Sequence, residues 1–459
     1  MGEEGSVPGF LGGAVADEPR AALAARDILS AGGTAADAAA ALYFTLAVTY
    51  PGAASLGGGG MCVTYERKTG KAEMLDFLGR APAQPGAVGV PGNVRGFAAL
   101  QARYGRLRWE QALATAEQAA RLGVPVSRAG VRALAAVQPE HRQALEPLLV
   151  GQDGKPLQEG DPIRQVELGT TLSRLRTAGP GDFYTGQLSR TLLQDIEGAG
   201  GTVSAEDLRQ AIAVWRQPIK FEFEHITLML PPTPGGAIVR QLWQATVAPS
   251  GLISSARTDF GAFAAALGPA YGSIDAASAL NPGASSGFAV ADREGNAVAC
   301  VVSMQRPFGA GKLARSTGIL LAAPPGPDGG ENRFMAPMLA ANYNVKQLFL
   351  AGAASGGAPA PAALAEAAIA ALAGGKTTGD ALALARLFAA GPGSPIWHEP
   401  NLDPALAGQL AQRGLGLRQV PDLARVNLNY CVNAIPRGEE TCSFRADPRG
   451  FGMAAGTGY

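Results

Sequence analysis

Apolar residues recur at helical spacing in the first part of the chain. Between Arg20 and Ser30 the Ala, Leu and Ile positions follow this spacing, and Gly32 and Gly33 end it. The next segment, 35–48, is apolar on nearly every side and follows a Thr that can cap a helix. Because a helix that is apolar all round has to be buried, we expect two helices here, the second of them inside the protein.

Shorter runs further along the chain have the alternating or continuous apolar pattern of strands. Segments 61–68 and 72–79 predict two strands joined by a turn, and segment 286–304 predicts a hairpin that turns at Asp292–Asn296. Segment 348–357 is typical of a strand that ends in a glycine turn, and a helix is expected at 359–373. This mixture of elements predicts a layered α/β protein with a central antiparallel hairpin.

Two other segments have weaker patterns. The run FEFEHITLMLPP, 221–232, is typical of a strand, and the turn PPTPGG leads into a further helix. Residues 249–283 are rich in Gly, Ala and Ser and show little periodicity. We therefore expect 249–283 to be an exposed connecting segment.

Composition excludes several classes of protein. Lys plus Arg and Asp plus Glu both number 38, and this balance argues against a nucleic-acid-binding protein, which normally has a basic excess. Apolar runs are too short for a membrane span, and the first ten residues lack the pattern of a secretory signal. Hydrophobic residues make up 47% of the chain, which is ample for a large core.

The four cysteines fall into two groups. Cys62 and Cys300 lie in strand-like runs, where we expect them to act as small buried hydrophobic side chains. Cys431 and Cys442 flank a predicted hairpin, and counting inward equally from both meets at Pro436–Arg437. This spacing is compatible with a cross-strand disulfide or with two free thiols. Three scattered His residues and the absence of a CxxC motif argue against a metal site.

A series of motifs, in order and along nearly the whole chain, resembles the γ-glutamyltransferase (γ-glutamyltranspeptidase) family of N-terminal-nucleophile hydrolases. Each motif is short, but eight or more in sequence are specific. They are AGGTAADAAAA (31–41), YPGAASLGGGGM (50–61), LDFLGRAP (75–82), AVGVPGNVRGF (87–97), DFYTG (182–186), GGTVSAEDL (200–208), PPTPGG (231–236), FAVADREGNAVA (288–299) and DPRGFGMAAG (447–456).

The resemblance implies a four-layer αββα sandwich and a proenzyme that cuts itself once, just before its nucleophile. The freed residue attacks a γ-glutamyl amide with its hydroxyl while its own α-amine serves as base. The family nucleophile aligns with Ser285, which divides the chain into a large-subunit-like segment, 1–284, and a small-subunit-like segment, 285–459, of one composite domain. Gly356 and Gly357 align with the glycine turn that forms the oxyanion hole.

The substrate pocket departs from the family pattern. The residue that aligns with the carboxylate-binding Arg is Leu78, and the acid and amide that hold the substrate amine align with 322–327, an Ala- and Pro-rich run. Arg80, two residues after Leu78, could replace the Arg or could be a solvated loop charge. The remaining substrate-binding candidates by alignment are Ser286, Ser303, Gln305 and Arg333.

These departures leave three hypotheses open. The chain could be an amide hydrolase or acyltransferase that uses Ser285 on an altered substrate, a γ-glutamyltransferase with a rearranged pocket, or a catalytically inactive relative that acts in binding or assembly. The first two predict a small-molecule amide or γ-glutamyl-like substrate, and the third predicts a protein partner. None needs a cofactor or a metal, and the family together with a cysteine pair favours a periplasmic or extracellular location.

Overall fold

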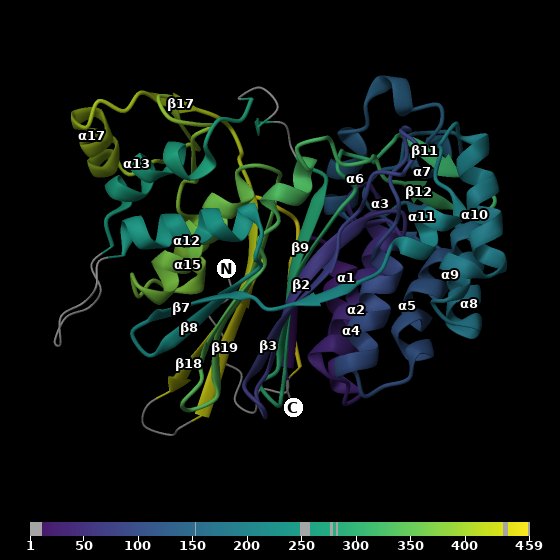
Figure 1. The fold of residues 1–459 in the computed structure, drawn as a ribbon, viewed down its shortest axis with the longest axis horizontal. Helices are drawn as coiled ribbons and strands as arrows, with labels where there is room; N and C mark the ends of the chain where they lie inside the picture. Colours follow the sequence, from purple (N-terminus) through teal and green to yellow (C-terminus); the bar gives the residue numbers. More distant parts are fainter. Residues whose placement is uncertain are drawn as a thin grey trace.

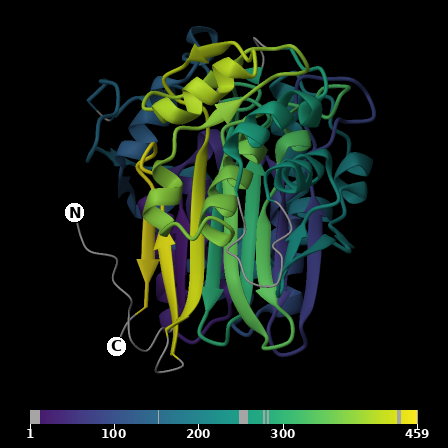
Figure 2. The ribbon, with the colours of Figure 1, turned by 90° about the vertical axis from the view of Figure 1, so that its left-hand side faces the viewer.

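Two antiparallel sheets lie face to face at the centre of the protein (Figure 1). The computed structural model describes residues 12–151, 153–247, 258–275, 279–280, 283–434 and 439–457, so the chain's first residues and residues 435–438, where the sequence predicts a turn, lie outside the described part. The first sheet has the order β20 (Met453–Gly456), β1 (Gly12–Ala16), β9 (Ser285–Asp292), β10 (Ala297–Ser303), β2 (Gly59–Glu66), β3 (Lys71–Phe77) and β6 (Val214–Arg216). The second, whose strands run side by side in Figure 2, has the order β19 (Glu439–Arg445), β18 (Arg425–Ala434), β14 (Gln347–Ser355), β13 (Met338–Asn342), β8 (Ile226–Leu230) and β7 (Ile219–Phe223).

Small and branched side chains fill the space between the sheets. Val63 and Ala289 of the first sheet belong to the same buried cluster as Leu339 and Ala351 of the second. At the start of β9, Gly287 packs against the backbone of β14, and a Cβ at this position would lie 3.0 Å from the carbonyl carbon of Ala353. The two sheets are therefore in close contact at the start of β9.

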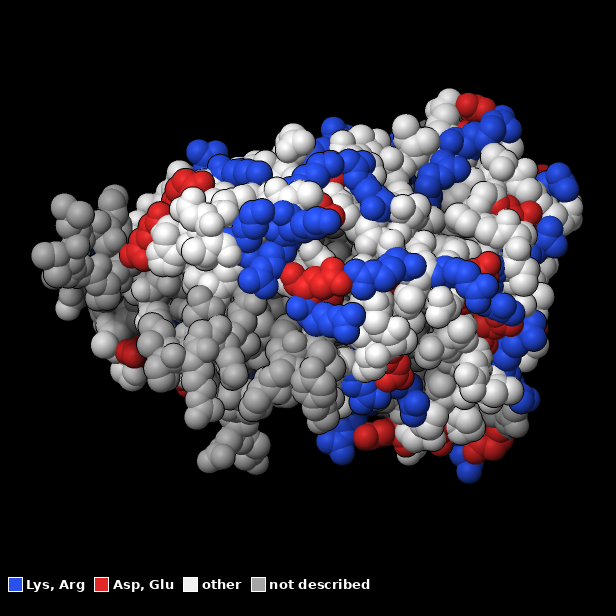
Figure 3. All heavy atoms as spheres, turned by 90° about the horizontal axis from the view of Figure 1, so that it is seen from below, with Lys and Arg blue, Asp and Glu red and all other residues white. Residues whose placement is uncertain are grey.

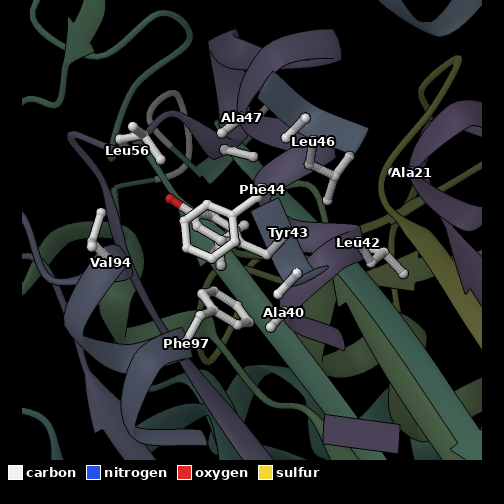
Figure 4. Packing of buried hydrophobic residues seen from close by; sticks show 14 of the residues in the cluster. Ala21, Ala40, Leu42, Tyr43, Phe44, Leu46, Ala47, Leu56, Val94 and Phe97 are labelled. Carbon is white, nitrogen blue, oxygen red and sulfur yellow. The ribbon is translucent and has the colours of Figure 1, made fainter. Parts of the chain in front are cut away.

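Helices cover the outer face of each sheet. The helix predicted to be buried, α2, packs at the centre of its layer, where the Tyr43 ring stacks on Phe97 with 4.0 Å between the ring centroids (Figure 4). Thr34 caps α2 and forms a capping box with Asp37. On the first sheet lie α1 (Pro19–Ser30), α2 (Ala35–Thr49) and α4 (Asn93–Tyr104), and on the second α12 (Pro234–Thr246) and α15 (Ala360–Leu372). Further helices pack on these: α5 (Trp109–Leu122) on α2, α8 (Val166–Ala178) on α5, and α13 (Phe260–Tyr271) on α12. The predicted four-layer αββα sandwich is confirmed.

Two predictions about local structure were wrong. The run 221–232 contains the end of β7 and all of β8, a tight hairpin, where one strand was expected. Within 249–283, which was expected to be an exposed connection, α13 buries Phe263, Leu267 and Tyr271 in the core behind the second sheet. The residues between them are mostly Ala and Gly, so large apolar side chains do not stand out at helical spacing in the sequence. The neighbouring residues 248–257, 276–278 and 281–282 lie outside the described part.

Both pairs of cysteines form disulfides. The cross-strand pair Cys431–Cys442 is confirmed, with the two residues directly opposite in the β18–β19 register. Cys62 and Cys300 are buried as expected, but they also form a disulfide that the sequence did not predict, because β2 and β10 are neighbours and their register places these residues opposite each other. A sequence separation of 238 residues hid this pairing from a search for local patterns.

Charge on the surface is mixed. On the face seen from below, Lys and Arg side chains are interspersed with Asp and Glu (Figure 3). No helix in the described ranges is both long enough and apolar enough to span a membrane. No group of three or more His, Cys, Asp or Glu residues among the described residues could hold a metal ion.

A buried ionic cluster joins α15 to the end of the second sheet. The Arg386 guanidinium is fully buried and lies 3.3 Å from Glu366 and 3.2 Å from Asp447. Arg449 binds Asp447 at 3.1 Å and also contacts Glu399. Burial raises the pKa of Glu366 to about 7, although Arg386 opposes the shift.

This raised pKa predicts a pH-dependent stability. Because the folded-state pKa of Glu366 lies above its unfolded value of 4.5, protonation favours the folded state. This contribution to the free energy of unfolding, on the order of 3 kcal/mol, is complete below about pH 4.5 and is lost as the pH rises to about 7. We expect Glu366→Gln to flatten this part of the profile when the free energy of unfolding is measured by denaturant titration. An unchanged slope between pH 4.5 and 7 would contradict the assignment.

Candidate functional site

Ser285 is the first residue of β9, two residues before the close contact between the sheets at Gly287. It is only 3% exposed, and Ser303 of β10 lies directly opposite it in the register. Its Oγ accepts a hydrogen bond from the Gly356 N–H at 3.3 Å. Thus the hydroxyl aligned with the family nucleophile lies beside the glycine turn from the facing sheet.

The glycine turn follows β14 directly. Gly356 and Gly357 have φ angles of +123° and +75°, which side-chain-bearing residues rarely adopt. A Cβ at Gly356 would also lie 3.0 Å from the Cα of Ala424. Glycine is therefore required for this turn to present its N–H groups toward the start of β9.

A buried carboxyl group, Glu331, completes the immediate surroundings of Ser285. It lies in a short 3-10 helix, η2 (Gly330–Phe334), and its Oε2 accepts hydrogen bonds from the Ala284 N–H at 3.2 Å and from the Ser303 hydroxyl. Burial raises the pKa of Glu331, and hydrogen bonds from the Ser303 and Ser285 side chains partly oppose this shift. The site thus contains a carboxyl group of increased basicity next to two hydroxyls.

A second buried carboxylate, Asp17, ties the two sheets together below the nucleophile. Its Oδ2 accepts from the Ser286 hydroxyl at 3.1 Å, the Gly287 N–H at 3.3 Å and the Ser355 hydroxyl at 2.9 Å. Its Oδ1 accepts from the Asn427 amide at 2.9 Å. Because these donors come from β9, β14 and β18, Asp17 sets the position of β9 relative to the glycine turn.

Gln305 connects β10 to the segment that carries Glu331. Its side-chain oxygen accepts from the Glu331 N–H at 3.1 Å, and its amide donates to Asn332 at 2.5 Å. The Gln305 backbone has a φ of +68°, an uncommon conformation for a residue with a side chain. Ser303 in turn accepts the Gln305 N–H at 2.8 Å. The predicted residues Ser303 and Gln305 thus belong to one network around Ser285.

The two arginines suggested for substrate binding have other partners. Arg80 is exposed, and its guanidinium donates to the backbone oxygens of Gln210 and Ile212 at 3.1 and 3.3 Å. Arg333 pairs with Asp328 at 2.8 Å, on the same loop as Glu331. Their roles in binding substrate stay predictions, and the structure brings neither guanidinium into a described contact with Ser285.

Sequence reasoning missed three residues of this network. Asp17 follows the first strand, Glu331 lies in the loop PDGGENRF, and Asn332 joins Gln305 to the backbone oxygen of Gly79. None lies in a motif quoted for the resemblance, and each meets Ser285 or its neighbours only through the fold. The one available signal for Asp17 was an acidic residue at the end of an otherwise apolar strand.

The stacked sheets, with a hydroxyl at the start of a central strand, define the fold of the N-terminal-nucleophile hydrolases. A similar solved structure is the cephalosporin acylase from Bacillus halodurans, with a TM-score of 0.80, 20% identity, and coverage of 99% of this chain and 97% of that one. The family model Gamma-glutamyltranspeptidase matches residues 21–248. The chain is a divergent member of the gamma-glutamyltranspeptidase family.

Curated relatives are similar over part of their length. The glutathione hydrolase proenzyme of Escherichia coli (strain K12) is 32% identical over 243 residues, 47% of this chain and 41% of that protein. The enzyme with the same name from Pseudomonas aeruginosa is 34% identical over 261 residues, 50% of this chain and 45% of that protein. The chain therefore matches less than half the length of these relatives. The family-model match ends before Ser285.

Proposed function

We propose that the protein is an amide hydrolase or acyltransferase that cuts itself between Ala284 and Ser285 and then uses the Ser285 hydroxyl as nucleophile. The single observation that carries this proposal is the 3.3 Å hydrogen bond from the Gly356 N–H to Ser285 Oγ, at the start of a central strand. The family membership of the chain and the glutathione hydrolase proenzymes among its relatives support the same chemistry.

The proposed reaction needs a base and an oxyanion site. After cleavage, the free α-amine of Ser285 would take the proton from its own hydroxyl as the hydroxyl attacks the substrate carbonyl. The N–H groups of Gly356 and Gly357 would stabilise the negative charge on the carbonyl oxygen, an effect of about 3–4 kcal/mol for one such donor in a comparable site. Water or an amine would then take the acyl group from Ser285.

The substrate proposed here differs from a γ-glutamyl amide. A γ-glutamyl group carries an α-carboxylate and an α-ammonium, and a buried charge without a partner costs several kcal/mol. Leu78 is partly buried and packs against the apolar layer between the sheets, and Ala322 and Ala323 are buried apolar residues. Arg333 is already paired with Asp328. These positions favour a small amide whose acyl part lacks the paired charges of glutamate.

The proposed cut produces the two segments 1–284 and 285–459. β9 and β10 belong to the second segment but lie between β1 and β2 of the first, so the pieces share one sheet. Cys62–Cys300 also joins them covalently. We propose a periplasmic or extracellular location, because disulfides persist in oxidising compartments.

The test is denaturing electrophoresis after reduction of the disulfides. We expect pieces of about 29 kDa and about 18 kDa, in proportion to their shares of the 46.7 kDa chain, and we expect the Ser285→Ala variant to remain whole. Ser189→Ala, which removes a buried hydroxyl from α10 (Gln187–Gly198), is the matched control and should be cut like the parent. A parent chain that stays whole would contradict self-cleavage and leave the inactive binding protein as the alternative.

A further inference from the structure

The uncut chain lacks the base that serves the mature nucleophile. Before cleavage, the nitrogen of Ser285 is part of the peptide bond to Ala284, and an amide nitrogen does not accept a proton from a hydroxyl at neutral pH. Self-cleavage of the kind proposed above therefore needs another proton acceptor near Ser285. Each of the three His residues lies outside the Ser285 network described above, so the candidates are the carboxyl groups.

Asp17 is a poor candidate because its oxygens are already occupied. They accept four hydrogen bonds from four different residues of the two sheets. Glu331 differs from Asp17 in its partners. One of its hydrogen-bond partners is the Ser285 side chain itself, whereas Asp17 binds the neighbouring Ser286. The Glu331 Oε2 also accepts from the Ala284 N–H and the Ser303 hydroxyl.

The position of Glu331 fits the bond that has to break. Its Oε2 is 3.2 Å from the nitrogen of Ala284, and a Cβ placed on Gly283 would lie 2.2 Å from its Oε1. The carboxyl group thus lies against the two residues that precede the proposed cut. On the other side of the same peptide, the carbonyl oxygen of Ala284 accepts the Met304 N–H at 3.0 Å.

We propose that Glu331 is the proton acceptor for cleavage of the Ala284–Ser285 bond, an inference that rests on the proposed function. Glu331 takes the proton of the Ser285 hydroxyl as Oγ bonds to the carbonyl carbon of Ala284, and the resulting oxyanion is stabilised by the Met304 N–H. The carbon–nitrogen bond then breaks, and Glu331 returns the proton to the nitrogen of Ser285. One water molecule hydrolyses the ester that remains, which leaves a carboxylate on Ala284 and a free hydroxyl and amine on Ser285.

Burial suits Glu331 to this role. The Glu331 side chain is only 8% exposed, and this burial raises its pKa. A carboxylate with a raised pKa is a stronger base than a carboxylate exposed to water. General-base catalysis of this kind contributes about 10²–10⁴-fold to a rate.

The experiment follows the cutting of freshly synthesised chain over time, by electrophoresis after reduction. We expect Glu331→Gln to slow cleavage at least about 100-fold. Gln keeps an oxygen that can accept from Ala284 and Ser303, so a purely structural role predicts no such loss. Glu73→Gln, a buried acid on β3 that binds Arg103, is the matched control and should be cut at the parental rate.

Each outcome decides between the two proposals. If the parent chain is cut and Glu331→Gln is cut within about threefold of its rate, the role of Glu331 is overturned and the proposed function stands. A parent chain that is never cut overturns both. If Glu331→Gln does not unfold cooperatively, it is not properly folded, and Glu331→Asp is used instead. Slower but complete cleavage of Glu331→Asp supports the role of the carboxylate, and an unchanged rate overturns it.

Discussion

Replacing Arg386 by Met is expected to lower the free energy of unfolding by about 3–5 kcal/mol. The guanidinium is fully buried and is hydrogen-bonded to Glu366, Asp447 and the backbone oxygens of Ala381 and Leu382. Met has a similar volume, so the loss comes from Asp447, which loses one of its charge partners, and from Glu366 and two carbonyl oxygens, which lose a buried donor. Equilibrium denaturation of the oxidised protein measures the change.

Two further variants separate this cause from a general loss of packing. Arg386→Met combined with Glu366→Gln should recover part of the loss, because the buried carboxyl group that has lost its partner is removed. Arg128→Met breaks an exposed ion pair with Glu159 and should cost at most about 1 kcal/mol. A loss below about 1 kcal/mol for Arg386→Met would show that the buried ionic cluster contributes little to stability.

Replacing Asp17 by Ala is expected to affect both stability and chemistry. Four buried donors, from Ser286, Gly287, Ser355 and Asn427, lose their acceptor, and each unsatisfied donor costs about 1–3 kcal/mol before relaxation. We expect an overall loss of about 3–5 kcal/mol. Because the same bonds position β9 against the glycine turn, the proposed cleavage before Ser285 should slow at least about tenfold.

The control for Asp17→Ala is Asp27→Ala on α1, an exposed residue paired with Arg26. It should change stability by less than about 0.5 kcal/mol and leave cleavage unchanged. Ser285→Ala should remain stable while it loses cleavage, which distinguishes the positioning role of Asp17 from that of the nucleophile. Normal cleavage in a folded Asp17→Ala protein would contradict a positioning role.

The sequence predicted those parts of the fold that depend on local patterns and ordered motifs. The all-apolar segment at 35–48 predicted a buried helix, and the hairpin at 286–304 appears as β9 and β10 with the expected turn. Pairing between distant strands was harder to predict. Nothing local to Cys62 indicates that β2 lies beside β10, so the disulfide to Cys300 could not be derived from spacing.

The candidate site shows the same limit. Alignment with family motifs singled out Ser285 and Gly356, which the structure brings together, although their catalytic roles stay predictions. Asp17 and Glu331 can be recognised as site residues only in the folded structure, where distant segments of the chain meet. In the sequence, an isolated acid in a loop or at a strand end is most often a surface residue. Their burial and their hydrogen bonds distinguish them from the other acids of the chain.

The bond between Cys62 and Cys300 has a consequence for the thermodynamics of the cut protein. It joins one residue from each side of the proposed cut, so the two pieces remain one molecule even when fully unfolded. The midpoint of thermal unfolding should then be independent of protein concentration, as for a single chain. After reduction the pieces can separate, unfolding becomes a dissociation, and the midpoint should rise with concentration.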